Sequence, residues 1–356
     1  MTTLTRPAPE TGRRRPVPWA RLAWVSWRQR RVPLITAAIL LAALSLYLLI
    51  MGLRIHSAYA GVTACHPASS TRCLILKSNF TVTYYQSFGA PMFDNIGKPN
   101  GVSSLLLVVP VLLGVFASAP LLARELETGT FRFAWTQGCG RLRWALAQLA
   151  LPAIALTATA GAFTALYSWY MRPFTALFAS GLGKSAMQPT EFPVHGVAFA
   201  AWTLVAFAIG AFAGVTIRRT VPAIAATIAA WTALALATAV FLRPHYEAPL
   251  ITSGGAPHQS PTLLNNAWVL SSWTTGPGGR AISATRLNSL VPFSVQNSNQ
   301  PNAFADWLTR HHYTQWWSYQ PESRYGHFQL IEGGWLLALS VVLIAATVWI
   351  IRRRAW

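Results

Sequence analysis

Two of the nine acidic residues in this 356-residue chain, Glu125 and Glu127, stand close together on one short polar segment. Arg124 and Thr128 flank them. Side chains three and four positions apart are neighbours on a helix, so this segment can form ion pairs along one helical face. Gly129 favours the end of that helix, because glycine is a poor helix former. The residues alone leave two interpretations open: a charged helix on a membrane surface, or a docking element whose ion pairs set the register of a protein partner.

Residues for bond-breaking chemistry do not form a recognisable motif. Gly183-Lys184-Ser185 matches the end of a phosphate-binding loop, but the full motif requires a glycine five residues before Gly183, where this chain has Phe178. The nucleophile elbow G-x-S-x-G and the zinc motif H-E-x-x-H are also missing from the sequence. We therefore expect no catalytic residue, no metal site and no cofactor bound by this chain.

Cys65 and Cys73 are two cysteines in a segment that the order of the apolar stretches places outside the membrane. An oxidising compartment favours a disulfide between them. A metal site with His66 is the alternative. Structural zinc needs four ligands, however, and only three are present locally. The sequence therefore favours the disulfide.

Glu332 stands near the start of an apolar stretch, just before Gly333-Gly334. An ionisable residue within a membrane span is a candidate for function. Glu332 is thus a candidate for a substrate path or an outer gate. The alternative is a carboxylate near the interface that binds Arg324 or a helix terminus.

Six stretches are apolar and long enough to cross a bilayer, which takes about 20 residues. Only 10% of the residues are charged and 53% are hydrophobic, whereas soluble proteins carry about 25% charged residues. The sequence therefore predicts an all-α integral membrane protein with six transmembrane helices. The stretches lie near residues 33–53, 102–122, 144–171, 194–216, 221–242 and 330–351.

Basic residues gather on one side of these spans. Of the 28 Lys and Arg residues, 17 precede span one, join spans two and three, join spans four and five, or follow span six. Loops rich in Lys and Arg stay in the cytoplasm, so both termini are expected to be cytoplasmic. The net charge of +19 is part of this pattern. No nucleic-acid partner is expected, because binding one needs a solvated basic face.

Composition divides the chain into four parts. The first is a basic cytoplasmic tail, the second holds five spans, the third is the largest outward loop, and the fourth holds the sixth span with a basic end. The parts are residues 1–32, 33–242, 243–329 and 330–356.

Smaller features lie within these parts. The stretch Trp19–Arg31 has the spacing of an amphipathic helix in the membrane interface. A cytoplasmic loop covers residues 123–143, and an outward loop covers residues 54–101. The outward loops are expected to be irregular, because residues 243–329 are rich in turn-forming Gly and Pro. The exception is a short amphipathic helix from Phe304 to His311.

Gly210 and Gly214 form a G-x-x-x-G pattern in the fourth span. Small residues at this spacing allow two helices to approach closely. Packing within the chain is the favoured interpretation over a seam between two copies.

Several of these segments resemble one family. Ala123–Thr130, followed by Trp135-Thr136-Gln137 and Arg141-Leu142-Arg143-Trp144, is similar to the cytoplasmic loop of type-two ATP-binding-cassette (ABC) permeases. The likeness is closest to the actinobacterial exporter branch. Trp24–Arg31 resembles that branch's helix before the first span. Tyr319–Tyr325 and Phe328–Glu332 are similar to its segment before the last span.

The resemblance implies a permease half that assembles with a second copy or a sister permease. It also implies a separate cytoplasmic ABC ATPase subunit, which would hold ATP and Mg. The segment from Arg124 to Thr130 would then be a coupling helix seated in a groove of that ATPase. The residues implied in this coupling are Arg124, Glu125, Glu127, Thr128, Gly129 and Thr130.

We therefore expect a multi-pass exporter permease of the bacterial plasma membrane, lying in the lipid bilayer and driven by a separate ATPase. Spans poor in charge favour an amphipathic or lipid-like substrate over an ion. One alternative is a membrane sensor or immunity subunit, which transports nothing and binds a ligand through its outward loop. The other is an integral membrane enzyme, against which the lack of a catalytic cluster in the sequence argues.

Overall fold

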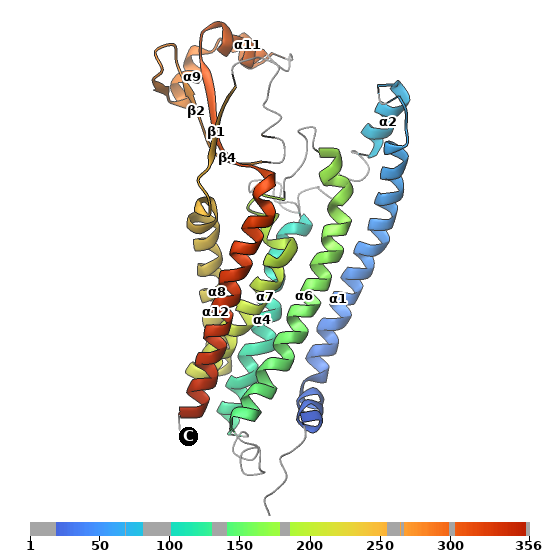
Figure 1. Ribbon diagram of the computed structural model, residues 1–356, viewed down its shortest axis with the longest axis vertical. Coiled ribbons are helices and arrows are strands. Elements are labelled where there is room, and N and C mark those ends of the chain that lie inside the picture. The colour runs from blue at the N-terminus through green and yellow to red at the C-terminus, as the bar shows by residue number, and fades with distance from the viewer. Residues whose placement is uncertain are drawn as a thin grey trace, which may run out of the picture.

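The computed structural model is an elongated helix bundle that carries a small sheet-containing subdomain at one end (Figure 1). Six helical segments among the described residues are long and apolar enough to cross a membrane, which confirms the predicted fold class. The structure describes residues 19–67, 69–80, 101–129, 141–178, 186–254, 264, 267–298 and 303–353. The six spanning helices are α1 (Trp19–Thr63), α4 (Gly101–Thr128), α6 (Arg141–Phe178), α7 (Gly196–Ile217), α8 (Thr220–Ala237) and α12 (Tyr325–Arg353).

The two ends of the bundle differ in what they carry. The start of α1, the end of α4, the turn between α7 and α8 and the end of α12 lie together at the lower end in Figure 1. This end, here called the inner end, carries the basic segments that were predicted to be cytoplasmic. The outer end carries the subdomain and the short helix α2 (Thr71–Phe80).

Helix α1 is longer than the sequence predicted. The expected interfacial helix Trp19–Arg31 is not a separate element, because it forms the first turns of α1. The ribbon bends at these turns in Figure 1. The helix also continues past residue 53, where the span was predicted to end, as far as Thr63. Packing against α6 explains the extension: Ile55 is fully buried, and the His56 ring stacks on Trp169 with a centroid distance of 4.5 Å.

Helix α7 lies at the centre of the bundle and packs against α4, α6, α8 and α12, while α1 packs on the far side of α6. Small residues make the closest of these contacts. A Cβ added at Gly114 of α4 would lie 2.3 Å from the Ala206 Cβ and 2.7 Å from the Ala206 carbonyl carbon. Gly210 and Gly214 face α4 in the same way, next to Ser118 and Ala119. The G-x-x-x-G pattern therefore serves packing within the chain, as predicted.

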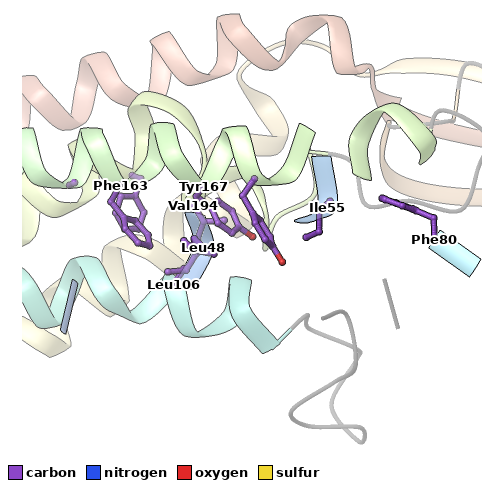
Figure 2. Close-up of a cluster of buried hydrophobic side chains, with 10 residues drawn as sticks. Leu48, Ile55, Phe80, Leu106, Phe163, Tyr167 and Val194 are labelled. Atoms are coloured by element: carbon purple, nitrogen blue, oxygen red, sulfur yellow. The ribbon is translucent and has the colours of Figure 1, made fainter. Parts of the chain in front are cut away.

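A cluster of buried apolar side chains joins α1 to the rest of the bundle in its outer half (Figure 2). Leu48 and Ile55 of α1 meet Phe163 and Tyr167 of α6. The cluster also includes Phe80 of α2, Leu106 of α4 and Val194 of the short 3-10 helix η2 (Phe192–Val194). Close van der Waals packing of these side chains fixes α1 in the bundle, and a hydrogen bond of 3.0 Å from His56 Nε2 to the Trp169 carbonyl oxygen adds a polar contact.

The expectation of irregular outward loops is wrong for the third loop. Four strands form one sheet in the order β1-β4-β2-β3, and each neighbouring pair is antiparallel. The cause is long-range pairing: the aromatic run that includes Trp316 and Trp317 forms the central strand, so β1 and β2 pair with residues far along the chain. The strands are β1 (Leu250–Gly254), β2 (Trp268–Thr275), β3 (Ala281–Ile282) and β4 (Thr314–Gln320).

Short helices cover part of this sheet. The predicted amphipathic helix is confirmed as α11 (Ala303–Arg310), with Leu308 buried. Leu308 packs with Leu287 of α9 (Ala284–Leu290) and with Val291, which precedes α10 (Phe293–Gln296). The subdomain therefore has a small apolar core of its own, separate from the core of the bundle.

The contact between α4 and α7 gives a first test. We expect Gly114→Ala to destabilise the protein by about 1–3 kcal/mol, because the added methyl group meets backbone and can be accommodated only if the helices separate. The control is Gly61→Ala in α1, where no atom of the described residues lies within 4 Å of the added Cβ. Thermal unfolding in detergent measures both. Equal melting temperatures for the two variants would contradict the close contact.

Candidate functional site

The polar segment that the sequence singled out forms the last turn of α4. Arg124, Glu127 and Thr128 are exposed there, and Glu125 is half-buried. The Thr128 hydroxyl donates a hydrogen bond of 2.8 Å to the Arg124 carbonyl oxygen, which closes this turn. Gly129 follows with a φ of +70°, a left-handed conformation that suits glycine and ends the helix. Thr130 lies outside the described residues. The exposed charges thus stand on the rigid end of a spanning helix.

Glu127 is bonded to another span. Its Oε2 atom accepts hydrogen bonds from the Thr220 backbone N–H at 3.2 Å and from the Thr220 hydroxyl at 2.9 Å. Thr220 is the first residue of α8, and the residue before it, Arg219, makes no side-chain cap. The first amides of a helix lack partners within the helix and carry partial positive charge, so a carboxylate stabilises them. Glu127 therefore caps α8 from α4, a role that the sequence did not reveal.

Small residues hold the two helices close enough for this cap. Ala119 and Ala123 of α4 pack with Ala213 of α7 and Ala223 of α8, and all but Ala213 are fully buried. A larger side chain here would separate α8 from α4. The cap and the alanine contact therefore depend on each other.

Glu332 is the centre of a second polar site, at the outer end. It is fully buried and pairs with Arg243, which is also buried. The Arg243 Nη2 atom lies 2.8 Å from Glu332 Oε1, and Arg243 Nε lies 2.9 Å from Oε2. This bidentate geometry makes arginine–carboxylate pairs strong. Arg243 begins the 3-10 helix η4 (Arg243–His245), just beyond α8.

Two further donors complete the Glu332 site. The Trp202 indole N–H donates to Oε1 at 2.8 Å, and the Tyr246 hydroxyl donates to Oε2 at 3.1 Å. Burial first, and then the Glu332 carboxylate, raises the pKa of the Tyr246 phenol above its usual value, so the phenol keeps the proton that it donates. Each carboxylate oxygen then accepts two bonds, which is about its full capacity. The carboxylate thus has no capacity left to bind a substrate in this conformation.

The partner expected for Glu332 is corrected by this geometry. Arg324 was the alternative suggested by the sequence, but its Nε atom lies 2.7 Å from Glu247 Oε2. His327 also contacts Glu247. The sequence missed Arg243, although one signal was present: this arginine directly follows an apolar span.

The same arginine holds a segment between α6 and α7. Its Nη1 atom donates to the Pro189 carbonyl oxygen at 3.4 Å, and its guanidinium lies 4.5 Å from the centre of the Phe192 ring. Gln329 of α12 secures this segment further by donating to the Phe192 carbonyl oxygen at 3.0 Å. The Arg243–Glu332 pair therefore connects α12 with the segment that follows α8 and with the segment between α6 and α7.

Cys65 and Cys73 are joined by a disulfide in the structure, with their Cα atoms 5.7 Å apart. The bridge ties α2 back to the end of α1. Within the described part of the chain, no group of three or more His, Cys, Asp or Glu side chains is placed to hold a metal ion.

The fold and these two polar ends define a polytopic membrane protein whose charged groups sit at the two ends of an apolar bundle. The model of the ABC-2 membrane transporter related family matches residues 38–243, and the chain belongs to that family. It is therefore a membrane permease component of the ABC-2 type. The match covers the first five spans and ends at Arg243. No curated protein and no solved structure matches the chain.

The buried pair gives a second test. We expect Glu332→Ala to destabilise the protein by about 3–5 kcal/mol, because it leaves the buried Arg243 charge without its counter-ion. Replacing both residues by methionine is expected to restore much of the loss, since an apolar pair carries no buried charge. Thermal unfolding in detergent measures both variants, with the exposed Glu322→Gln as control. A double variant no more stable than Glu332→Ala would contradict the pairing.

Proposed function

We propose that this chain is the permease subunit of an exporter that is driven by a separate cytoplasmic ATPase. The observation that carries the proposal is the last turn of α4, where Arg124, Glu127 and Thr128 are exposed at the basic inner end. A rigid extension of a spanning helix can pass the movement of a docked subunit into the membrane. Family membership supports the same assignment, because an ABC-2 permease works with an ATPase.

Ion pairs between this turn and the ATPase would set the register in which the two subunits dock, rather than supply most of the free energy of docking. Exposed pairs contribute only about 0–1 kcal/mol each. The burial would come from the aromatic residues that follow, Phe131, Phe133 and Trp135, which lie outside the described residues. ATP and Mg would be held by the ATPase, and a second copy or a sister permease would complete the path.

The spans support an amphipathic or lipid-like substrate. Among the described residues of the spans, the buried ion pair lies at the outer end. Glu332 already forms this pair with Arg243, so its carboxylate is not free to bind a substrate. The clusters in the inner half of the bundle consist of apolar side chains and small residues, so a path through this part would be apolar. Such a path is better suited to an apolar or amphipathic molecule than to an ion, whose desolvation would not be compensated. We place transport in the outward direction, away from the ATPase.

One observation favours a second function. The outward subdomain has its own sheet and its own small core, which a ligand-binding sensor or immunity subunit would need. Such a subunit would use the same inner end without moving a substrate. ATP-driven uptake of a fluorescent lipid into inverted vesicles, with the ATPase present, separates the two: uptake supports the exporter, and ligand-stimulated ATP hydrolysis without uptake supports the sensor.

The docking proposal gives a third test. We expect Glu125→Arg combined with Glu127→Arg to reduce transport by about tenfold or more, because the reversal breaks the ion pairs that would set the register of docking. ATP hydrolysis by the ATPase should persist but no longer follow transport. Transport and hydrolysis are measured together in vesicles, and Glu322→Arg, an exposed reversal on the outer side, is the control. Unchanged coupling in the double variant would contradict the proposal.

A further inference from the structure

The span Thr220–His245, which begins with α8, is held at both ends by glutamates from other helices. At its inner end, Glu127 of α4 bonds the backbone and side chain of Thr220. At its outer end, Glu332 of α12 bonds Arg243. With 18 residues at 1.5 Å each, α8 is about 27 Å long. Two of the chain's nine acidic residues thus anchor opposite ends of one span.

Between these anchors α8 packs one face on α4 and α7 and leaves its other face uncovered by the described chain. Of its 18 residues, all of which the structure describes, only Ala223 and Thr227 are buried. Trp231 adds a bond of 3.4 Å to the Trp202 carbonyl oxygen, and its ring meets the Trp202 ring edge-on. Side chains such as Val221 are exposed. The packed face positions α8 against α4 and α7, and the two ends add polar contacts to other helices.

The outer end of α8 departs from α-helical geometry. A π-helical turn, η3 (Thr238–Leu242), follows α8, and the Arg243 N–H bonds the Thr238 carbonyl oxygen. A π turn inserts an extra residue and shifts the register of the residues after it, and such turns are frequent at functional sites. Here the turn leads directly into Arg243. Movement of α8 along its axis would therefore act on the ion pair through this turn.

Arg243 connects this movement to three parts of the outer end. It bonds α12 through Glu332, and it holds the segment before α7 through Pro189 and Phe192. The chain then reaches Glu247, which pairs with Arg324 next to the sheet. A shift of α8 would move these parts together.

We propose that α8 carries the movement of the inner end to the outer end, with Glu127 as the positioning residue that links α8 to the last turn of α4. The inference rests on the proposed function, because the movement has to come from a docked ATPase. Glu127 acts here through the geometry of its cap on Thr220. In this role it needs an acceptor oxygen, whereas a docking role would need its charge.

Two variants separate the cap from the charge. Glu127→Gln keeps an acceptor oxygen for Thr220 but removes the charge, and Glu127→Ala removes both. The experiment uses the complex of the full chain with its ATPase, without nucleotide and trapped with ATP and vanadate. Backbone hydrogen exchange is measured by mass spectrometry at residues 123–129 and 238–245.

In the wild type we expect trapping to change exchange at both segments. Glu127→Gln should retain the change at residues 238–245. Glu127→Ala should reduce it by about threefold, the factor expected for losing one cap, while the change at 123–129 persists. An undiminished change at 238–245 in Glu127→Ala, or equal loss in both variants, would overturn the inference and leave the proposed function standing. A wild type that responds at neither segment would overturn the proposed function and, with it, the inference.

A second variant keeps the test open if Glu127→Ala does not fold. Thr220→Val removes the hydroxyl that donates to Glu127 but leaves the glutamate and its charge intact. Thr220→Ser keeps the hydroxyl and is the matched control. We expect the response at residues 238–245 to weaken in Thr220→Val and to match the wild type in Thr220→Ser. Equal responses in the two variants would overturn the inference.

Discussion

The charges of Glu332 and Arg243 are buried together among apolar groups, and each is tolerated there only because the other is present. This requirement orders much of the outer end. It brings the end of α8 against α12, and it places Trp202 and Tyr246 where they complete the bonds of the carboxylate. The third guanidinium nitrogen of Arg243, Nη1, donates to the Pro189 carbonyl oxygen. Pairing of one buried charge thus organises the segments that meet at this end.

The inner end depends on close packing rather than on buried charge. Gly114, Gly210 and Gly214 let α4 and α7 approach until backbone meets side chain. The buried alanines that include Ala123 and Ala223 bring α8 to the same place. Only at this separation can Glu127 reach Thr220. The exposed turn of α4 is therefore both a surface for a partner and a contact within the chain. A displacement of this turn would act directly on α8 through that contact.

The outward subdomain shows where local patterns are least informative. Turn-forming residues separate its strands, and periodicity indicated only the helix that became α11. The sheet arises from pairings such as Ser253 with Trp316 and Trp273 with Trp316, which join distant parts of the chain. Trp273 and Trp316 stack across the sheet with a centroid distance of 6.4 Å. The aromatic run that includes Trp316 and Trp317 forms β4, which lies between β1 and β2.

The sequence by itself determined the six spans, the helix end at Gly129 and the close approach at Gly210 and Gly214. These features follow from apolar length, backbone freedom and side-chain size, which are properties of neighbouring residues. Tertiary structure alone decided that Glu332 pairs with Arg243 instead of Arg324, and that Glu127 caps α8. The partners in these contacts are 89 and 93 positions apart. Only the packing of the helices brings these partners together. Hydrogen bonds act over a few ångströms, and the order of residues along the chain does not show which distant residues come that close.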